Sequence, residues 1–357
     1  MTHPDTDSPV LRVAQVGLGW VALHRHLPAM RAHGGFEVFG VIDRQPERAA
    51  RVGRDQRIPR SHCGDDLRHV PWLDDVDVVV IATSPFSHVD LAAAALERGK
   101  HVLVEKPLAM TVADGEALVS LAHQCGRVLG IVHNFQFARS TRMLLRDLNA
   151  GKLGAPRALI ASQLGNPARR LPAWYEELPL GLFYDESPHL LYLLRCLSPA
   201  PLRLLSCTMF PSSVGHVTPA SIHAQYETGE GTMRRPVTLT MHFESPVSEW
   251  HVTVLGDHAL GDVDVFRDIY LRLPNDGRHD TWPVLRTSLV ATAQHWGQHF
   301  QRGPLHLAGK LLYGNDEVFA RFHQAVSTGG QLQGVSGEDG LHVLRMQHEI
   351  IGNAHRL

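Results

Sequence analysis

Residues 11–22 read LRVAQVGLGWVA and decide the fold of this chain. The apolar run before the first glycine predicts a buried strand, and the apolar periodicity from Trp20 to Met30 predicts a helix. The glycines between them have the spacing G-x-G-x-x-A. Strand, tight turn and helix in this order predict the start of a doubly wound α/β domain.

Each small residue of the turn has a physical role in binding a dinucleotide. Gly17 permits the sharp turn, Gly19 leaves room for a pyrophosphate, and Ala22 lets the helix lie close to the strand. The free N–H groups at the helix N-terminus, where Trp20 and Val21 lie, would then bind the phosphates. The alternative is a turn that serves only the fold.

An acidic residue follows at the position where a dinucleotide site needs one. The apolar run from Phe36 to Ile42 ends in Asp43, whose carboxylate can accept hydrogen bonds from ribose hydroxyls. The same negative charge repels a 2′-phosphate, which favours NAD as the cofactor. Arg44 comes next and could pair with that phosphate, so NADP stays open.

Helix and strand patterns alternate through the rest of the first half. Short apolar strands are predicted at 77–82, 101–104 and 127–132, with helices at 46–54, 87–98 and 111–125. The alternation predicts a parallel, doubly wound sheet and an NAD(P)-binding Rossmann domain over residues 1–134. The residues that follow its strands should line one crevice at the carboxyl edge of the sheet. They are Gly17, Asp43, Thr83, Glu105 and His133.

The triplet Glu105-Lys106-Pro107 follows the strand predicted at 101–104. A lysine at the carboxyl end of a strand, in a cofactor crevice, is well placed to act on a substrate hydroxyl. Pro107 biases Lys106 away from helical backbone. The alternative is a surface lysine in a loop, and position alone does not separate the two.

With these residues in place, the chain resembles the Gfo/Idh/MocA oxidoreductases. The resemblance rests on the glycine turn, the acidic end of the second strand, Thr83 followed by His88, and above all Glu105-Lys106-Pro107. It is strong over the first half and fainter towards the C-terminus. It implies that Thr83, His88, Glu105 and Lys106 belong to the cofactor site.

The family has a second motif, an aspartate and a histidine four residues apart. This chain has Asp185 and His189 at that spacing. On a helix the two would share a face. Pro188 leaves open whether one helix runs through both residues or begins there. The family's glycine-rich stretch before the aspartate is reduced here to Gly181, which puts the shape of the substrate pocket in doubt.

The resemblance implies a catalytic trio. His189 would take the hydroxyl proton, because the unperturbed pKa of an imidazole is about 6.5, near the working pH. Asp185 would orient His189 and stabilise its protonated form. Lys106 would hydrogen-bond the reacting oxygen, stabilise the developing alkoxide or share the proton transfer.

After residue 134 the pattern changes and predicts an α+β domain over 135–357 for substrate binding and oligomerisation. Strict alternation over Val237–Phe243 predicts a half-buried strand in an open, mostly antiparallel sheet. The resemblance implies that an exposed face of this sheet builds a homodimer or homotetramer. The full set is strands at 157–162, 202–209, 222–226, 237–243, 251–255 and 264–273, and helices at 139–148, 285–300, 315–327 and 338–352.

Four residues are candidates for substrate contact. Trp174 and Tyr184 have apolar rings with polar tips that suit the face of a sugar or cyclitol, although ordinary core aromatics look the same. Asn134 follows the last predicted strand of the first domain. Arg169, with Arg170, could recognise the phosphate of a nucleotide sugar or belong to a solvated loop.

The composition limits the classes of partner that we expect for this protein. With 34 Lys and Arg against 36 Asp and Glu, the formal net charge of −2 gives no reason to expect nucleic acid or an anionic membrane. Four scattered cysteines and no signal-peptide pattern favour a cytoplasmic protein. The 24 histidines include the pairs His24/His26 and His295/His299, but neither pair has an evident third ligand, so no metal is predicted.

These observations predict an NAD(P)-dependent dehydrogenase or reductase acting on a CH–OH group of a sugar, nucleotide sugar or cyclitol. The alternative is a non-catalytic dinucleotide-binding regulator, since one fold serves many functions. A third hypothesis keeps the enzyme but changes the bond, to an imine, a pyrrole or a glycosidic linkage.

Overall fold

The structure, a computed structural model, describes residues 9–169 and 171–356. The chain divides into two compact units, residues 1–134 with 314–345 and residues 135–313 with 346–357. The sequence predicts boundaries of 1–134 and 135–357, so the structure differs by grouping the stretch 314–345 with the first unit. Helix α8 (Asn315–Thr328) packs against α1 (Leu27–His33), which explains this grouping. Arg170 and most of the N-terminal segment used for the localisation prediction lie outside the described residues.

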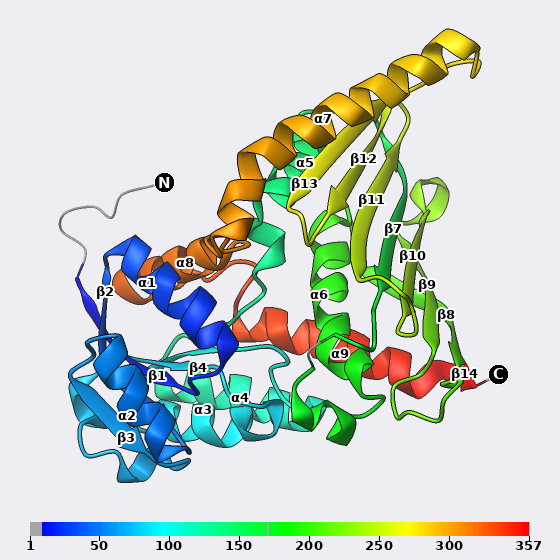
Figure 1. The fold of residues 1–357 in the computed structure, drawn as a ribbon. Helices are drawn as coiled ribbons and strands as arrows, with labels where there is room; N and C mark the ends of the chain where they lie inside the picture. Colours follow the sequence, from blue (N-terminus) through cyan, green and yellow to red (C-terminus); the bar gives the residue numbers. More distant parts are fainter. Residues whose placement is uncertain (1–8, 170, 357) are drawn as a thin grey trace. The chain divides into compact units, whose positions relative to one another are not determined.

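Among the described residues, the first unit contains one six-stranded parallel sheet in the order β3-β2-β1-β4-β5-β6 (Figure 1). This order confirms the predicted doubly wound sheet, and it reverses beside β1, where such folds bind ligands. Central strands are buried on both faces, as the fully buried β4 shows. The strands are β1 (Leu11–Val16), β2 (Phe36–Asp43), β3 (Arg60–Cys63), β4 (Val78–Ile81), β5 (His101–Val104) and β6 (Leu129–Ile131).

The helix after the glycine turn runs to His33 and contains a π-helical segment, Ala22–His26, before α1. Gly34 ends it with φ of 78°, a left-handed conformation that suits glycine. The other helices of this unit are α2 (Pro46–Asp55), α3 (His88–Glu97), α4 (Val112–Cys125) and α8, and α9 (Gly337–Asn353) continues into the second unit.

The second unit contains, within its described residues, an eight-stranded sheet in the order β13-β12-β11-β7-β10-β9-β8-β14. Most neighbouring strands are antiparallel, while β10–β7 and β14–β8 are parallel, which confirms the predicted mixed, mostly antiparallel sheet. The strands are β7 (Pro156–Leu164), β8 (Leu202–Phe210), β9 (Ser221–Thr228), β10 (Arg235–His242), β11 (Glu249–Gly256), β12 (Ala259–Asp264), β13 (Ile269–Pro274) and β14 (Ala354–Arg356).

Helix α6 (Leu182–Leu197) packs against β7, β10 and β11 and continues through Pro188 (Figure 1). A proline inside a helix has no N–H for the carbonyl four residues earlier, here that of Tyr184. The side chain of Gln347 supplies the missing donor, with Nε2 2.7 Å from that carbonyl oxygen and 2.9 Å from Ser187 Oγ. This settles the question that Pro188 raises in the sequence, because one helix carries both Asp185 and His189.

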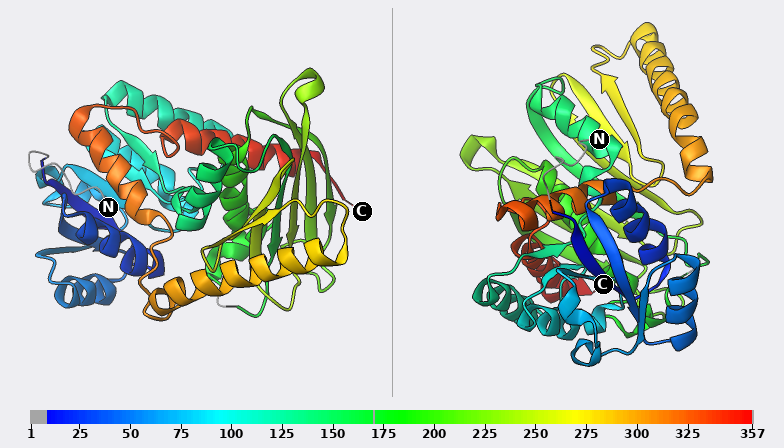
Figure 2. Two further views of the ribbon diagram at one scale, coloured as in Figure 1. Left: turned by 90° about the horizontal axis from the view of Figure 1, so that it is seen from above. Right: turned by 90° about the vertical axis from the view of Figure 1, so that its left-hand side faces the viewer.

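Two further helices belong to the second unit, α5 (Arg139–Asn149) and α7 (Thr281–Leu307). The long α7 lies beside β13, the strand at one edge of the sheet (Figures 1 and 2). No helix in the described part of the chain is both long and apolar enough to cross a membrane.

Candidate functional site

The first glycine of the turn is required by its own surroundings. Gly17 has φ of 79°, and a Cβ there would lie 2.5 Å from the carbonyl oxygen of Ala82. A Cβ on Gly19 would meet no protein atom within 4 Å. Gly19 is therefore not needed for packing, and the open space beside it is what a pyrophosphate needs.

The two glycines should respond differently to the same substitution. Gly17→Ala should lower the free energy of unfolding by roughly 2–5 kcal/mol, through backbone strain and overlap with Ala82. Gly19→Ala should leave unfolding nearly unchanged and weaken dinucleotide binding by about tenfold or more. Denaturant unfolding and calorimetric titration of both variants check this, and equal unfolding losses in the two would contradict it.

The carboxylate of Asp43 is buried and holds the glycine turn. Its Oδ2 accepts a hydrogen bond from the N–H of Leu18 (2.9 Å), and its Oδ1 accepts one from the N–H of Gln45 (2.9 Å). Arg48 Nη1 lies 3.4 Å from Oδ2. The side chain of Arg44 is exposed beside it. Asp43 thus joins the ends of β1 and β2, and its remaining lone pairs can still accept ribose hydroxyls.

The residues at the start of the helix differ in exposure. Trp20 is 52% exposed, and its ring stacks on His24 at a centroid distance of 5.0 Å and lies under the guanidinium of Arg25. Val21 is exposed and Ala22 is completely buried. Ala22 therefore packs as the spacing predicts, while Trp20 and Val21 border open space.

A buried histidine that the sequence prediction missed holds the loop of Lys106. His26 lies in the π-helical segment, and its Nε2 is 2.9 Å from Oε1 of Glu105. Glu105 Oε2 also accepts the N–H of Lys106 (3.2 Å). Burial alone would raise the pKa of Glu105, but the hydrogen bond with His26 and the positive charge of Lys106 hold it below its usual value. Glu105 is therefore a structural carboxylate that fixes the backbone next to Lys106.

His88 supports the same loop from another side. It is completely buried, with Nδ1 2.7 Å from the carbonyl oxygen of Pro107 and Nε2 3.3 Å from that of Thr83. Burial lowers the pKa of His88, so the ring is neutral at pH 7 and donates its single N–H to one of these two oxygens. The resemblance implies a place for His88 in the cofactor site, and the structure places it behind the loops rather than on their surface.

Three more predicted residues lie at carboxyl ends of strands in the first unit. Lys106 follows β5 and is half-buried. Thr83 follows β4, where its hydroxyl accepts a hydrogen bond from Ser87 Oγ (2.8 Å). Asn134 follows β6 and is 8% exposed. All three follow neighbouring strands of one parallel sheet, β4-β5-β6, so they end at the same edge.

The two candidate acid–base residues of the second unit lie on α6. Between Leu182 and Leu191, only Asp185 and His189 are partly exposed, and the other eight residues are buried. One helical turn separates the two, so they share a face. This face is the one open part of an otherwise buried stretch of helix.

His189 is held by neighbours that the sequence prediction missed. Its Nδ1 lies 2.9 Å from the hydroxyl of Tyr192, which is buried and also accepts the N–H of Phe135 (3.1 Å). The rings of Phe135 and Trp250 lie 5.0 and 5.4 Å from the imidazole centroid. Tyr192 is three residues after His189, on the same helix, and that spacing was the available signal.

The predicted substrate residues of this unit differ in what they offer. Tyr184 is completely buried, with its hydroxyl 3.1 Å from Nε2 of His348, so it is a core aromatic. Arg169 forms an ion pair with the buried Glu186, so it is neither a solvated arginine nor an uncommitted phosphate ligand. Trp174 is half-exposed in a short 3₁₀ segment, Ala173–Glu177, and keeps a ring face that a ligand could contact.

Of the histidine pairs weighed for a metal, His295 and His299 stack their rings at a centroid distance of 6.1 Å, and His24 and His26 have separate partners. His26 bonds Glu105, while His24 contacts Trp20 through both its ring and its Nδ1. Among the described residues, one other group has metal-ligand geometry, Glu249, His251 and Asp264, with ligand atoms within 4.8 Å of one another. The guanidinium of Arg267 already donates to both carboxylates of this group, at 2.6 Å each, and we assign no metal to it.

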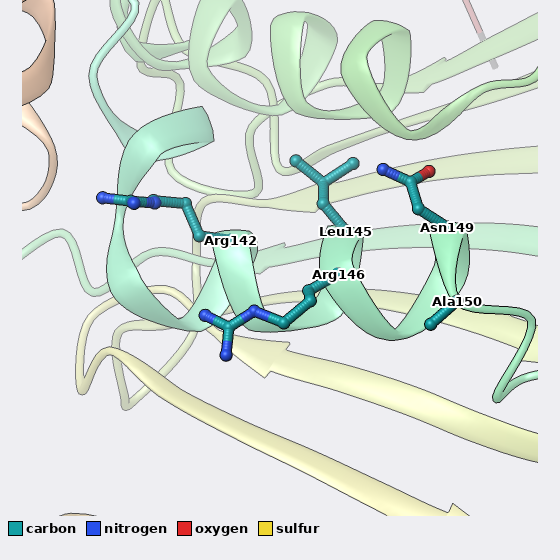
Figure 3. A pocket seen from close by; sticks show the side chains of 5 residues that line it. All are labelled: Arg142, Leu145, Arg146, Asn149 and Ala150. Carbon is teal, nitrogen blue, oxygen red and sulfur yellow. The ribbon is translucent and has the colours of Figure 1, made fainter.

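A hollow of about 560 Å³ lies elsewhere in the second unit, along α5 (Figure 3). Its lining comes from a single helix, so polar groups do not converge on it from different elements. The lining residues are Arg142, Leu145, Arg146, Asn149 and Ala150.

Residues 11–133 match the model of a family described as an oxidoreductase family with an NAD-binding Rossmann fold, GFO_IDH_MocA. The fold and the glycine turn therefore define a Rossmann domain of the NAD-binding kind. The match confirms, for residues 11–133, the resemblance to the Gfo/Idh/MocA oxidoreductases found in the sequence.

Curated relatives match part of the chain. The 4-carboxy-2-hydroxymuconate-6-semialdehyde dehydrogenase of a Sphingobium species is 34% identical over 143 residues, which is 40% of this chain and 44% of that protein. The 1,5-anhydro-D-fructose reductase of Ensifer adhaerens is 33% identical over 164 residues, 46% of this chain and 48% of that protein. The chain thus spans about half the length of the curated relatives it matches.

Solved structures share the fold across the whole chain. The WlbA dehydrogenase from Bordetella pertussis, solved with NADH and UDP-GlcNAcA, has a TM-score of 0.75 at 15% identity, covering 98% of this chain and 97% of that one. At this identity the likeness establishes the fold.

Proposed function

We propose that this protein is an NAD(P)-dependent oxidoreductase that transfers hydride between nicotinamide and a secondary alcohol or ketone of a sugar, nucleotide sugar or cyclitol. The observation that carries the proposal is the carboxyl edge of the first sheet, where the glycine turn, Asp43 and Lys106 follow β1, β2 and β5. The anhydrofructose reductase supports a carbohydrate-like substrate. The semialdehyde dehydrogenase extends the class to other small carbonyl compounds.

The residues of the turn fit a dinucleotide. The space beside Gly19 accommodates a pyrophosphate next to the N–H groups that begin the helix, and Asp43 lies at the position of a ribose ligand. When bound, the cofactor supplies the hydride chemistry. We propose NAD as the preferred cofactor, since the buried carboxylate of Asp43 opposes a 2′-phosphate, while Arg44 and Arg48 keep NADP possible.

Replacing Asp43 by alanine tests the cofactor assignment. The variant should bind NAD about 10- to 100-fold more weakly, because it loses hydrogen bonds to a charged group. NADP should lose less, so the ratio of NAD to NADP affinity should fall. Calorimetric titration with both cofactors measures this, with the exposed Glu47→Ala as the matched loss of charge in the same helix–turn region. An unchanged ratio would remove Asp43 as the ribose ligand.

We assign the chemistry to Lys106, His189 and Asp185. His189 accepts the hydroxyl proton in oxidation and returns it in reduction. Lys106 donates a hydrogen bond to the reacting oxygen and stabilises negative charge on it. Asp185 stabilises the protonated imidazole, and the hydroxyl of Tyr192 fixes the ring orientation through Nδ1.

Substrate contact is proposed for Trp174 and Asn134, since the ring of Trp174 is half-exposed and Asn134 follows β6 beside the end of β5. We further propose a cytoplasmic protein, which four free cysteines suit, and a homodimer or homotetramer.

The first experiment is calorimetric titration with NAD, NADH, NADP and NADPH, followed by a turnover screen of sugars, nucleotide sugars and cyclitols read by nicotinamide absorbance. Binding with turnover supports the enzyme and identifies its substrate class. If the cofactor binds but none of these compounds turns over, and neither does an added panel of imines and glycosides, the result favours the regulator. Absence of binding overturns the assignment of Gly17 and Gly19.

A further inference from the structure

Helix α7 turns its polar side towards its own sheet. The side-chain amide of Gln298 accepts from the N–H of Tyr270 (3.0 Å) and donates to the carbonyl of the same residue (2.6 Å). One helical turn earlier, Gln294 makes the same pair of bonds with Arg272, at 2.8 and 2.9 Å. The two glutamines thus satisfy the open backbone of β13, the edge strand.

The opposite side of α7 is apolar and faces solvent. At 100° per residue, positions separated by three, seven, fourteen and eighteen residues return to the same side of a helix. Five large exposed residues follow this spacing and form one stripe, named here the α7 stripe, whereas Val284 and Leu305, each 37% exposed, lie on other sides of the helix. The five residues of the stripe are Trp282 (69% exposed), Leu285 (46%), Leu289 (57%), Trp296 (53%) and Phe300 (70%).

A helix that exposes an apolar side of this kind to solvent is typical of an interaction surface. Three aromatic rings and two leucines along one line exceed the scattered apolar residues of an ordinary surface. The polar glutamines already satisfy the edge of the sheet, so the stripe has no role in the packing of its own unit. We propose that the α7 stripe is the contact surface for a second copy of this chain, packed antiparallel about a two-fold axis.

The sizes of the side chains are self-complementary in that arrangement. When the two-fold axis passes between Thr292 and Ala293, a residue of one copy lies opposite the residue of the other copy that is equally far from the axis on its other side. In this arrangement Trp282 faces a glycine, and the other large side chains can pack beside one another. The opposed pairs are Trp282 with Gly303, Leu285 with Phe300, and Leu289 with Trp296. Space exists at Gly303, where a Cβ would meet only the ring of His299, at 3.8 Å.

The helix dipoles agree with the same arrangement, and few charged residues lie along the helix. Within 281–307 the charged residues are Arg286 and Arg302, and Arg302 pairs with Asp268 of its own unit. Asp276, Arg278 and Asp280 precede the helix, and the exposed Lys310 follows it. In an antiparallel pair the dipoles of the two helices run in opposite directions, which is the favourable arrangement.

The exposed area is of the size that a dimer needs. At 150–250 Å² for a whole aromatic side chain, the exposed parts of the three rings offer roughly 300–450 Å². A standard interface buries about 800 Å² on each partner, so the rings supply about half of one protomer's share. The outward positions of the sheet carry polar side chains instead, such as Gln225, Thr238 and Asp262, which favours the helix as the apolar contact.

The test measures the assembly of the full chain by sedimentation velocity over a concentration series. The wild-type chain should be an oligomer, and Leu289→Arg should raise the dissociation constant by about 30-fold or more, because it places a charge at the centre of the interface. Met233→Arg, at a 63% exposed residue outside α7, should assemble like the wild type. Circular dichroism and cofactor titration check that the variants are folded.

A cysteine experiment tests the axis independently of that variant. In a Cys63→Ser background, oxidised Ala293→Cys should cross-link to its own counterpart, whereas Trp282→Cys should not, because its counterpart is about 30 Å away along the helix. A monomeric wild type, an oligomer unaffected by Leu289→Arg, or cross-linking at residue 282 would overturn the proposal.

Discussion

Lys106→Ala should lower kcat by about a thousandfold while the affinity for the cofactor changes by less than about threefold. The reason is that a hydrogen-bond donor to a developing oxyanion acts mainly in the transition state, where one such donor contributes about 100- to 1,000-fold and a shared proton transfer adds to this. The backbone at Lys106 should stay in place, because Glu105, His26 and His88 hold the loop without using the lysine side chain.

Steady-state kinetics on the substrate found in the screen, with calorimetry for the cofactor, measure this. Lys152→Ala is the matched control, since it removes a half-exposed lysine whose ion pair with Asp147 contributes little. Lys106→Arg keeps the charge but not the compact ammonium, and should recover only part of the rate. Undiminished turnover in Lys106→Ala would remove Lys106 from the mechanism.

The parts of the fold that sequence predicts well are those decided by local chemistry. The strand at Leu11–Val16 and the strand at His101–Val104 have the predicted bounds, because continuous apolar runs between turn residues have few alternatives in an α/β chain. Gly17 is a similar case. Its positive φ and the contact with Ala82 follow from the turn that the spacing demands.

Elements shaped by tertiary contacts were missed or wrong. The strand predicted at 264–273 covers the end of β12, a turn and most of β13. The turn at 265–268 was missed because it contains no glycine or proline and begins with two apolar residues. Asp268 adopts φ of 54° in that turn, and its carboxylate accepts the N–H of Ser140 and pairs with Arg302. Strand β3 at the sheet edge is largely exposed and has no apolar pattern.

The residues of the candidate site show the same difference between local sequence signals and tertiary contacts. Asp185 and His189 were found because a four-residue spacing is visible in the sequence, whereas the continuity of their helix depends on Gln347, more than 150 residues away. His26 and Tyr192 were missed, since the groups that they hold, Glu105 and His189, become their neighbours through a π-helical segment and a helix face. The sequence therefore indicates the proposed reacting groups more directly than the groups that would position them.

His189→Ala should lower kcat by about 100- to 10,000-fold, the usual range for a positioned acid–base group, with little change in cofactor affinity. Tyr192→Phe should give a smaller loss of about tenfold, because it removes the hydroxyl beside Nδ1 but leaves the imidazole in place. Tyr192→Phe also removes the hydroxyl that accepts the N–H of Phe135. The unfolding midpoint of this variant must therefore be measured together with its turnover rate.

The pH dependence separates chemistry from packing in these two variants. If His189 carries the proton, the wild-type rate of alcohol oxidation should fall at acidic pH as the imidazole becomes protonated, and this limb should disappear in His189→Ala. Tyr192→Phe should keep the limb but displace it, since a hydroxyl at Nδ1 stabilises one protonation state over the other. An acidic limb that survives in His189→Ala would assign the proton transfer to Lys106 instead, and a Tyr192→Phe profile that coincides with the wild type would leave Tyr192 with a packing role only.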